Sequence, residues 1–377
     1  MSVLKVAFHA TLKPPDHPTP SGDRTVARLI LAALTAAGAE VTMPSRLPTR
    51  ARTGDGEEMS RLRAAAETEA GRLIAMVHRG EAQRPDVWLT YHLYYKAPDW
   101  IGATVARALA VPYVVAEASY AGKRDRDGWA PWQREMLGQL RQADAVLCLS
   151  PADRAGIAPL VADARLFDFP PFLDTAPFAM LARPEPAPGA PTRLVAVAMM
   201  REGVKLDSYR HLAAALGQLG DRAWSLTIVG DGPARDKVQA AFTHLPGDRI
   251  VWAGLADDAG VRAVLGGSDI LVWPGIGEAF GMVYLEAAAA GVPAIAYASD
   301  GVAAVVRDSN TGIMVPPHDV AGLAGAIAAL IDDPVRRAGL ATAARTFATG
   351  ERSLAQASVR LSDVLYPLVG KPRPTGR

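Results

Sequence analysis

The chain has very little cysteine and no long apolar run. Its 377 residues include one cysteine, Cys148, in the apolar segment 145–149. An internal disulfide framework and a cysteine-based metal site are therefore not expected, and Cys148 reads as a small buried side chain. No window approaches the roughly 18 uninterrupted apolar residues of a membrane-spanning helix. The apolar part of the first ten residues is too short for a secretion signal, and Asp and Pro follow quickly. We expect a cytoplasmic protein, with peripheral contact at the inner face of the membrane left open.

An excess of charge of either sign is also missing. Lys and Arg number 40 against 39 Asp and Glu, which gives a net charge of +1. This balance gives no indication of a nucleic-acid partner. Half of the residues are apolar and 21% are charged, a composition typical of globular proteins. The length exceeds that of an ordinary single domain and predicts two.

Short apolar strands alternate with amphipathic helices through most of the chain. A strand over 3–9 is followed by a proline-rich loop, a helix over 23–37 and a second strand over 39–43. This strand-helix-strand order predicts a parallel sheet. The alternation starts again with a strand over 193–198. The intervening segment 183–192 is rich in Pro and Ala without periodicity, which predicts a linker.

The most informative stretch is 268–293, which predicts a strand, a loop and a helix. The apolar run 269–273 suits a buried strand, and 281–290 is rich in helix formers and closed by a glycine and a proline. Two carboxylates, Glu278 and Glu286, bracket the start of this helix with seven residues between them.

This arrangement of a helix start, glycines and two carboxylates is suited to binding a ligand. The first turn of a helix offers unpaired N–H groups to an anion. Glycines at 275, 277 and 281 would let a ligand approach the backbone. An ionised carboxylate on the helix could accept hydrogen bonds from two ribose hydroxyls. The plainer explanation is that one Glu favours the helix dipole and the other lies on a solvated face.

The residues GEAFGMVYLEAAAAGVPAIA at 277–296 resemble the E-x7-E signature of GT-B-fold retaining glycosyltransferases, family 4 in particular. The match includes the Gly-Glu opening, the Phe-Gly and Glu-Ala pairs and the Gly-Val-Pro end. The resemblance implies an α/β fold with two Rossmann-like, doubly wound parallel-sheet domains facing a central cleft. It implies an acceptor-side domain over 1–182, a donor-binding domain over 193–350, and a C-terminal helix within 351–377 that returns toward the first domain.

The resemblance also implies roles for residues of the second domain. Arg201 and Lys205 are expected in the turn after its first strand, where their charges would neutralise a diphosphate. Together with Glu278 they form the expected catalytic set. Their separation is shorter than is usual in the family, and two solvated loop cations are the alternative. The expected donor-binding residues are Gly254, Leu255, Phe280, Gly281, Met282, Val283 and Glu286.

The first domain departs from the family pattern. Gly22 is all that remains of a glycine pair, and Glu117 to Ser119 occupy the place of a histidine after the strand at 112–116. We keep five residues as candidate acceptor or cleft residues, each of which could instead be structural: Gly22, Arg24, His92, Glu117 and Ser119. The arginine-rich segment 44–84 is interpreted as a solvated face, with an acceptor-binding or membrane-facing surface as the alternative.

The function implied by the resemblance is a retaining glycosyl transfer of the EC 2.4 type. The donor would be a nucleotide-diphosphate sugar, and the acceptor a glycan, a lipid-linked molecule or a small molecule. No cofactor or metal is expected, because Arg, Lys and the helix dipole would supply the positive charge. Two alternatives remain open: a GT-B-like nucleotide-sugar isomerase or phosphorylase, and a non-catalytic nucleotide-sugar-binding protein.

Overall fold

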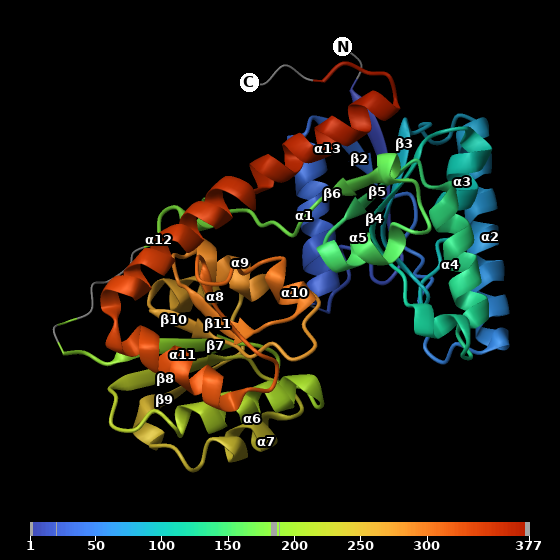
Figure 1. Ribbon diagram of the computed structural model, residues 1–377. Helices are drawn as coiled ribbons and strands as arrows, with labels where there is room; N and C mark the ends of the chain where they lie inside the picture. Colours follow the sequence, from blue (N-terminus) through green and yellow to red (C-terminus); the bar gives the residue numbers. More distant parts are fainter. Residues whose placement is uncertain (1–2, 20, 182–186, 188, 374–377) are drawn as a thin grey trace. The chain divides into compact units, whose positions relative to one another are not determined.

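The computed structural model describes residues 3–19, 21–181, 187 and 189–373, which form two compact units (Figure 1). Unit 1 comprises Met1–Pro170 and Leu354–Arg377, and unit 2 comprises Pro171–Ser353. The C-terminal segment thus belongs to the same unit as the start of the chain. Half of the predicted linker at 183–192 lies outside the described residues.

Unit 1 contains a six-stranded parallel sheet in the order β2-β1-β3-β4-β5-β6. The strand order changes direction between β1 and β3, which pair directly through Val6 and Val87. The carboxyl ends of these two strands therefore flank the topological switch point, where open α/β sheets bind ligands. The strands are β1 (Leu4–Ala10), β2 (Ala39–Thr42), β3 (Val87–Tyr94), β4 (Tyr113–Ser119), β5 (Ala145–Cys148) and β6 (Leu166–Asp168).

Helices cover both faces of this sheet. Figure 1 shows α2, α3 and α4 together on one face, where Trp88, Trp132 and Met136 are fully buried, and α1 with α13 on the other. The α13 helix is tied to α1 by the Tyr366 hydroxyl, which donates to the Ala37 carbonyl over 3.1 Å. The helices are α1 (Gly22–Ala36), α2 (Gly56–His78), α3 (Gly102–Leu109), α4 (Ala130–Gln142), α5 (Pro151–Ile157) and α13 (Leu354–Leu368).

Unit 2 contains a second six-stranded parallel sheet, in the order β12-β11-β10-β7-β8-β9. Numbered from β7, this is the 3-2-1-4-5-6 order of dinucleotide-binding folds, with its switch point between β7 and β10. The two sheets confirm the predicted pair of doubly wound α/β domains. The strands are β7 (Thr192–Val197), β8 (Trp224–Val229), β9 (Ile250–Gly254), β10 (Ile270–Val272), β11 (Ala294–Tyr297) and β12 (Gly312–Val315).

In unit 2, α6 packs against α7 and α11, and α9 packs against α8 and α12. Three of these helices, α7, α8 and the short α10, were not predicted from the sequence. The sequence predicts that the first helix of unit 2 starts at Asp207, but α6 begins three residues earlier, at Val204. The reason is that Gly203 adopts a positive φ of 74° at the cap position and the helix follows directly. The helices are α6 (Val204–Leu216), α7 (Arg235–Ala241), α8 (Asp258–Gly266), α9 (Met282–Ala289), α10 (Asp300–Ala303), α11 (Val320–Asp332) and α12 (Pro334–Glu351).

Candidate functional site

The switch point of unit 2 brings two chain segments together. The turn after β7 leads through Arg201 into α6, and the loop after β10 leads through Glu278 into α9. The two strands are hydrogen-bonded neighbours, with Leu194 opposite Ile270. Both segments therefore leave the sheet side by side at its carboxyl edge, where the sequence placed the donor site.

Lys205 and Glu278 form an ion pair across these segments. The Lys205 ammonium contacts Oε1 of Glu278, and the Trp273 indole N–H donates to the same oxygen over 3.0 Å. The ammonium also lies 5.4 Å from the centre of a Trp273 ring. The prediction that Lys205 lies in the turn was wrong, because the earlier start of α6 places it in the first helical turn. Its side chain consequently projects from a fixed backbone.

The glycines of the loop have a structural explanation that the sequence did not suggest. Gly275 and Gly281 adopt φ of 69°, and a Cβ at either position would collide with Tyr284, at 2.2 and 2.5 Å. Tyr284 is buried and donates its hydroxyl proton to the Trp273 carbonyl over 2.8 Å. Glycine at these two positions therefore leaves room for Tyr284, whose hydrogen bond fixes the loop. From the sequence, both glycines were expected to let a ligand approach the backbone.

Two further contacts hold this loop. The Ile276 N–H donates to the buried Ser208 hydroxyl over 3.1 Å. Gly301, in α10, lies so close that a Cβ there would be 2.0 Å from the Ala279 carbonyl oxygen. The loop that carries Glu278 is therefore supported by α6, α9 and α10, and its geometry is largely set before any ligand binds.

The N-terminus of α9 has no side-chain cap. Gly281 occupies the cap position, and Met282 and Val283 begin the helix with no side chain accepting from its first N–H groups. Phe280, directly before the cap, is only 8% exposed. Such a helix start presents unpaired N–H groups and the positive end of the dipole, which together favour an anion.

Glu286 lies one turn further along α9 and is strongly desolvated. Burial, reinforced by the negative charge of Asp258 and partly offset by Arg262, raises the pKa of the Glu286 carboxyl to about 7. Among the described residues, no hydrogen bond or ion pair to this carboxyl is recorded. A half-buried carboxyl without a partner suits a ligand that brings hydrogen-bond donors.

The remaining donor-side candidates do not contact this cluster. Arg201 is exposed in the turn after β7, and its guanidinium makes no ion pair within the described part of the chain. Gly254 ends β9 with φ of 69°, and its carbonyl accepts from the Gly230 N–H over 2.7 Å. Leu255 follows it and is 71% exposed.

Unit 1 gathers a different set of residues at its own switch point. His92 Nδ1 lies 3.4 Å from Oδ1 of Asp23 and 3.8 Å from Oε1 of Glu117. His92 and Glu117 both adopt a positive φ, 67° and 61°, at facing positions of β3 and β4. The predicted strands ended at Tyr91 and Ala116, but both continue through these left-handed residues. Positive φ at residues other than glycine is costly and tends to occur at functional sites.

Electrostatics favour a proton in this cluster. Burial acts to lower the pKa of His92, but Glu117 and Asp23 outweigh it and raise that pKa. Burial, with a contribution from Asp153, raises the pKa of Glu117, against the attraction of His92. Glu117 is 6% exposed, and its Oε2 has no hydrogen-bond partner. The cluster thus contains more acidic than basic groups, and both pKa shifts favour its protonated form.

The other unit 1 candidates have structural contacts. Arg24 donates to the His17 carbonyl over 2.9 Å, and Ser119 donates to Asp153 over 2.6 Å. Gly22 begins α1, and a Cβ there would meet no neighbour. Asp23 was not predicted as a site residue, because an acid in the first turn of a helix commonly serves only to favour the helix dipole.

Half of the arginines in the segment 44–84 pair with a carboxylate. Arg46 pairs with Asp16, Arg63 with Glu67 and Arg72 with Glu69. These pairs favour the interpretation of a solvated face. Within the described residues, no helix has the length and apolar character needed to cross a bilayer.

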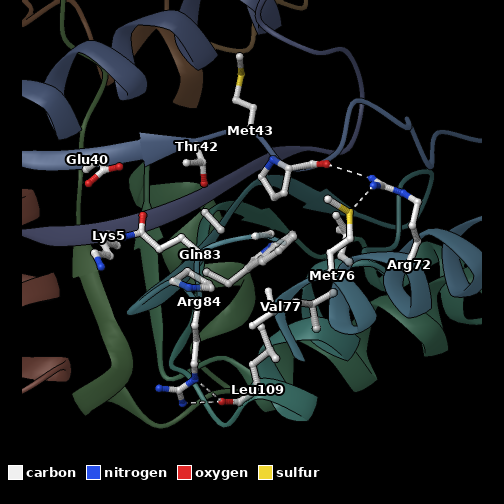
Figure 2. A pocket seen from close by; sticks show the side chains of 17 residues that line it. Lys5, Glu40, Thr42, Met43, Arg72, Met76, Val77, Gln83, Arg84 and Leu109 are labelled. Atoms are coloured by element: carbon white, nitrogen blue, oxygen red, sulfur yellow. Dashed lines mark hydrogen bonds between the residues drawn. The ribbon is translucent and has the colours of Figure 1, made fainter. Parts of the chain in front are cut away.

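An apolar cavity of about 210 Å³ lies in unit 1, away from the candidate residues (Figure 2). Met43, Met76 and Val77 contribute to its lining. Two arginines on its rim donate to backbone carbonyls, Arg72 to Pro44 and Arg84 to Leu109. Their guanidinium groups are therefore already used by the protein.

The sequence was compared with known families and proteins. The family model described as "Glycosyl transferases group 1" matches residues 191–333. A glycogen synthase of Mycobacterium tuberculosis is 29% identical over 302 residues, covering 76% of this chain and 70% of its own. A GDP-mannose-dependent alpha-(1-6)-phosphatidylinositol monomannoside mannosyltransferase of Mycolicibacterium smegmatis is 30% identical over 292 residues, covering 71% and 75%.

Solved structures show the same fold. A glycosyltransferase from Rickettsia africae superposes with a TM-score of 0.76 at 14% identity, over 99% of this chain and all of the other. A sucrose-phosphate synthase from Thermosynechococcus elongatus gives 0.72 at 19% identity, over 97% and 99%. Anabaena Alr3699/HepE in complex with UDP gives 0.69 at 14% identity, over 97% and 100%. With the family match and the 30% identical relative, these results show that the chain belongs to the group 1 glycosyltransferases and has their two-domain GT-B fold.

Proposed function

We propose that unit 2 binds a nucleoside-diphosphate sugar and that the protein transfers the sugar with retention of its anomeric configuration. The observation that carries this proposal is the Lys205–Glu278 pair at the switch point of unit 2, on a loop that leads into the uncapped N-terminus of α9. Positive charge, an oriented carboxylate and free N–H groups are what a diphosphate joined to a sugar requires.

In this proposal the protein stabilises the leaving group. Negative charge develops on the diphosphate as the bond to the sugar breaks. Lys205 and the first N–H groups of α9 supply preorganised positive charge, and Arg201 adds a flexible guanidinium from the neighbouring turn. We propose that these groups suffice without a bound metal.

The two glutamates take different parts. Lys205 and Trp273 both bind Oε1 of Glu278, so the other oxygen is the one offered to a sugar hydroxyl. Glu286 would accept hydrogen bonds from the two ribose hydroxyls, which requires the ionised carboxylate. Because the pKa of Glu286 is about 7, bound hydroxyls must lower it for this role to operate near neutral pH.

The base, the sugar and the acceptor are to be identified by experiment. One relative is named as GDP-mannose-dependent, whereas a structural neighbour is a complex with UDP. UDP, GDP and ADP should be compared by thermal shift, since a bound ligand raises the unfolding temperature. One of them is expected to give a clear, saturable shift.

The matching nucleotide sugars would then be incubated with candidate acceptors, and the product anomer read by NMR. Retention, with rates unchanged by a chelator, supports the proposal. An inverted product overturns the retaining mechanism. Sugar conversion without any acceptor would instead indicate an isomerase, and tight binding without turnover a non-catalytic binding protein.

A further inference from the structure

A continuous row of aromatic rings in unit 1 starts at His92. Each ring contacts the next, with centroids 4.8 to 5.9 Å apart, and the row leads away from the carboxyl end of β3. The successive rings are those of His92, Tyr94, Tyr95, Trp129, Trp132 and Trp100. Neither the predicted donor residues nor the proposed mechanism accounts for this row.

An open pocket of about 530 Å³ lies along the row. Trp129 and Trp132 form its aromatic side, and Asp55, Arg124 and Asp127 contribute polar groups. The volume falls within the usual range for small-ligand sites, which is roughly 300 to 1,000 Å³. Aromatic walls with a few polar groups are also the usual lining of such sites.

The loop that forms one wall of the pocket is tightly organised. The carboxylate of Glu58 accepts the backbone N–H groups of Arg52, Thr53 and Gly54 over 2.8 to 2.9 Å. Burial opposes ionisation of Glu58, but these hydrogen bonds outweigh it and lower its pKa to about 2. The carboxylate is therefore charged at any physiological pH and keeps the loop in one conformation.

Trp129 is held against this loop. Gly54 has φ of 78°, and a Cβ there would lie 2.7 Å from the Trp129 ring, so only glycine allows the contact. The neighbouring Trp132 donates its indole N–H to the Gly54 carbonyl over 2.7 Å. The aromatic side of the pocket is thus preorganised, which reduces the entropy cost of binding.

The charges around the pocket favour a neutral ligand. Arg124 pairs with Asp127 over 2.5 Å and also lies over the Tyr95 ring. Asp55 caps α2 by accepting from the Glu58 N–H. The pocket lining therefore contains one cation and two carboxylates, and Lys96 adds a second cation 5.1 Å from the centre of a Trp129 ring. These two positive and two negative charges balance. This balance opposes an anionic lipid headgroup, and the carboxylates can still accept hydrogen bonds from hydroxyls.

We propose that this pocket is a saccharide-binding subsite, and that the acceptor of the transfer is a glycan rather than a lipid or a small aglycone. That the bound saccharide is the acceptor rests on the proposed function, whereas saccharide binding itself is argued from the pocket alone. The apolar face of a sugar ring packs on Trp129, while its hydroxyls donate to Asp55 and Asp127 and accept from Arg124. The row of rings leads from this subsite to His92.

The cavity of Figure 2 serves as a contrast within the same unit. It is more enclosed and more apolar, but Arg72 and Arg84 on its rim are bound to backbone carbonyls. Its volume of about 210 Å³ also lies below the usual range for small-ligand sites, which begins at roughly 300 Å³. The observations therefore favour the aromatic pocket as the saccharide site.

The test uses the full chain on an array of neutral and anionic oligosaccharides, followed by calorimetry with the best-bound saccharide. We expect neutral oligosaccharides to be captured. Trp129→Ala should weaken their binding at least tenfold, and Trp129→Phe, which keeps a ring, should weaken it less. Arg126→Ala is the matched control, because Arg126 is exposed on the same loop and does not line the pocket.

Thermal unfolding of each variant shows whether it is folded, and Trp129→Phe keeps the test informative if Trp129→Ala is not. Capture of no saccharide, or equal binding by Trp129→Phe, Trp129→Ala and Arg126→Ala, overturns the inference. Trp129-dependent binding to phosphatidylglycerol vesicles in place of saccharides overturns it as well. Binding of UDP, GDP and ADP is measured in parallel. Failure of all three nucleotides with intact saccharide binding contradicts the proposed function and leaves the subsite standing.

Discussion

The two units differ in strand order, but each sheet has one switch point, and the two switch points are electrostatically opposite. Each sheet reverses its order once, between β1 and β3 in unit 1 and between β7 and β10 in unit 2. In unit 2 the switch point contains Lys205 and the uncapped start of α9. In unit 1 the helix α1 is capped by Ser21 and carries Asp23 in its first turn, facing His92.

This difference indicates which unit binds which substrate. Ser21 caps the N-terminus of α1 and Asp23 lies in its first turn, so this helix start already has its partners. Glu117 adds a further carboxyl beside His92. A diphosphate would be repelled there, whereas a hydroxyl would find acceptors. The start of α9 is free for the diphosphate. This contrast supports our proposal that unit 2 binds the donor, which can be tested by changing one unit at a time.

The largest effect is expected from Lys205→Met. Removing a preorganised cation that stabilises the leaving group should lower kcat about 10²- to 10³-fold, as loss of a comparable donor does in other enzymes. Donor affinity should change less, which steady-state kinetics with the identified nucleotide sugar would reveal. Lys237→Met is the matched control, because Lys237 is an exposed cation paired only with Glu202. Equal losses in the two variants would remove Lys205 from the mechanism.

Gly301→Ala should be the most destabilising change in the donor loop. A Cβ at this position would overlap the Ala279 carbonyl at 2.0 Å, so the loop carrying Glu278 must move. We expect a loss of about 2 to 4 kcal/mol in the free energy of unfolding, measured by urea titration, together with weaker nucleotide binding. Gly325→Ala is the control, since a Cβ in that helix meets nothing within 4 Å. It should be neutral or slightly stabilising.

Glu286→Gln should weaken nucleoside diphosphate binding about tenfold in calorimetry, because it removes an ionised acceptor. Wild-type affinity should also fall as the pH drops below about 7, where the carboxyl of the free protein is protonated. The variant should lack this pH dependence. A wild-type affinity that stays constant from pH 8 to pH 5.5 would contradict the ribose assignment.

The same residue links stability to pH. The Glu286 pKa is raised from 4.5 to about 7 in the folded chain, so the folded state retains a proton that the unfolded state loses. Wild-type stability should therefore fall as the pH rises through that window, by up to about 3 kcal/mol. Glu286→Gln should not show this fall. Urea titrations at pH 5 and pH 8 measure the difference.

The smallest effect is expected from His92→Asn in unit 1. Asn tolerates the left-handed backbone, so the fold should persist. The negative charges of Glu117, Asp23 and Asp153 raise the pKa of His92 in the folded chain. Protonated His92 therefore stabilises the fold, and this stabilisation is complete at pH values below the pKa that His92 has in the unfolded chain. That stabilisation is lost as the pH rises through the folded pKa. The variant should lack this loss, while nucleotide binding stays unchanged. A changed nucleotide affinity would contradict the separation between the units.

The fold could be predicted from the sequence where local sequence signals mark the ends of an element. The sequence predicts strands over 294–297 and 312–315, because each is a short apolar run bounded by Gly, Pro or Ser, and β11 and β12 have these bounds. The ends of β3 and β4 were not, since no local rule foresees that His92 and Glu117 continue a strand with positive φ. Lys205 was placed in a turn because the helix start at Gly203 carries no capping side chain.

The candidate site was readable only in part. The glutamates at 278 and 286 were singled out by type and spacing, and the cations at 201 and 205 by resemblance to the family. The Lys205–Glu278 pair joins residues 73 positions apart and needs the sheet order to be known. The packing of Tyr284 on two glycines and the contact of Asp23 with His92 are likewise tertiary.

The central claim, that unit 2 alone binds the nucleoside diphosphate, is tested most directly by hydrogen exchange. Exchange of the full chain would be compared with and without a saturating concentration of whichever of UDP, GDP and ADP binds. We predict that the bound nucleotide slows exchange in peptides covering 199–206 and 274–290. Exchange in peptides covering 21–30 and 91–120 should not change. Protection confined to the unit 1 peptides would contradict it.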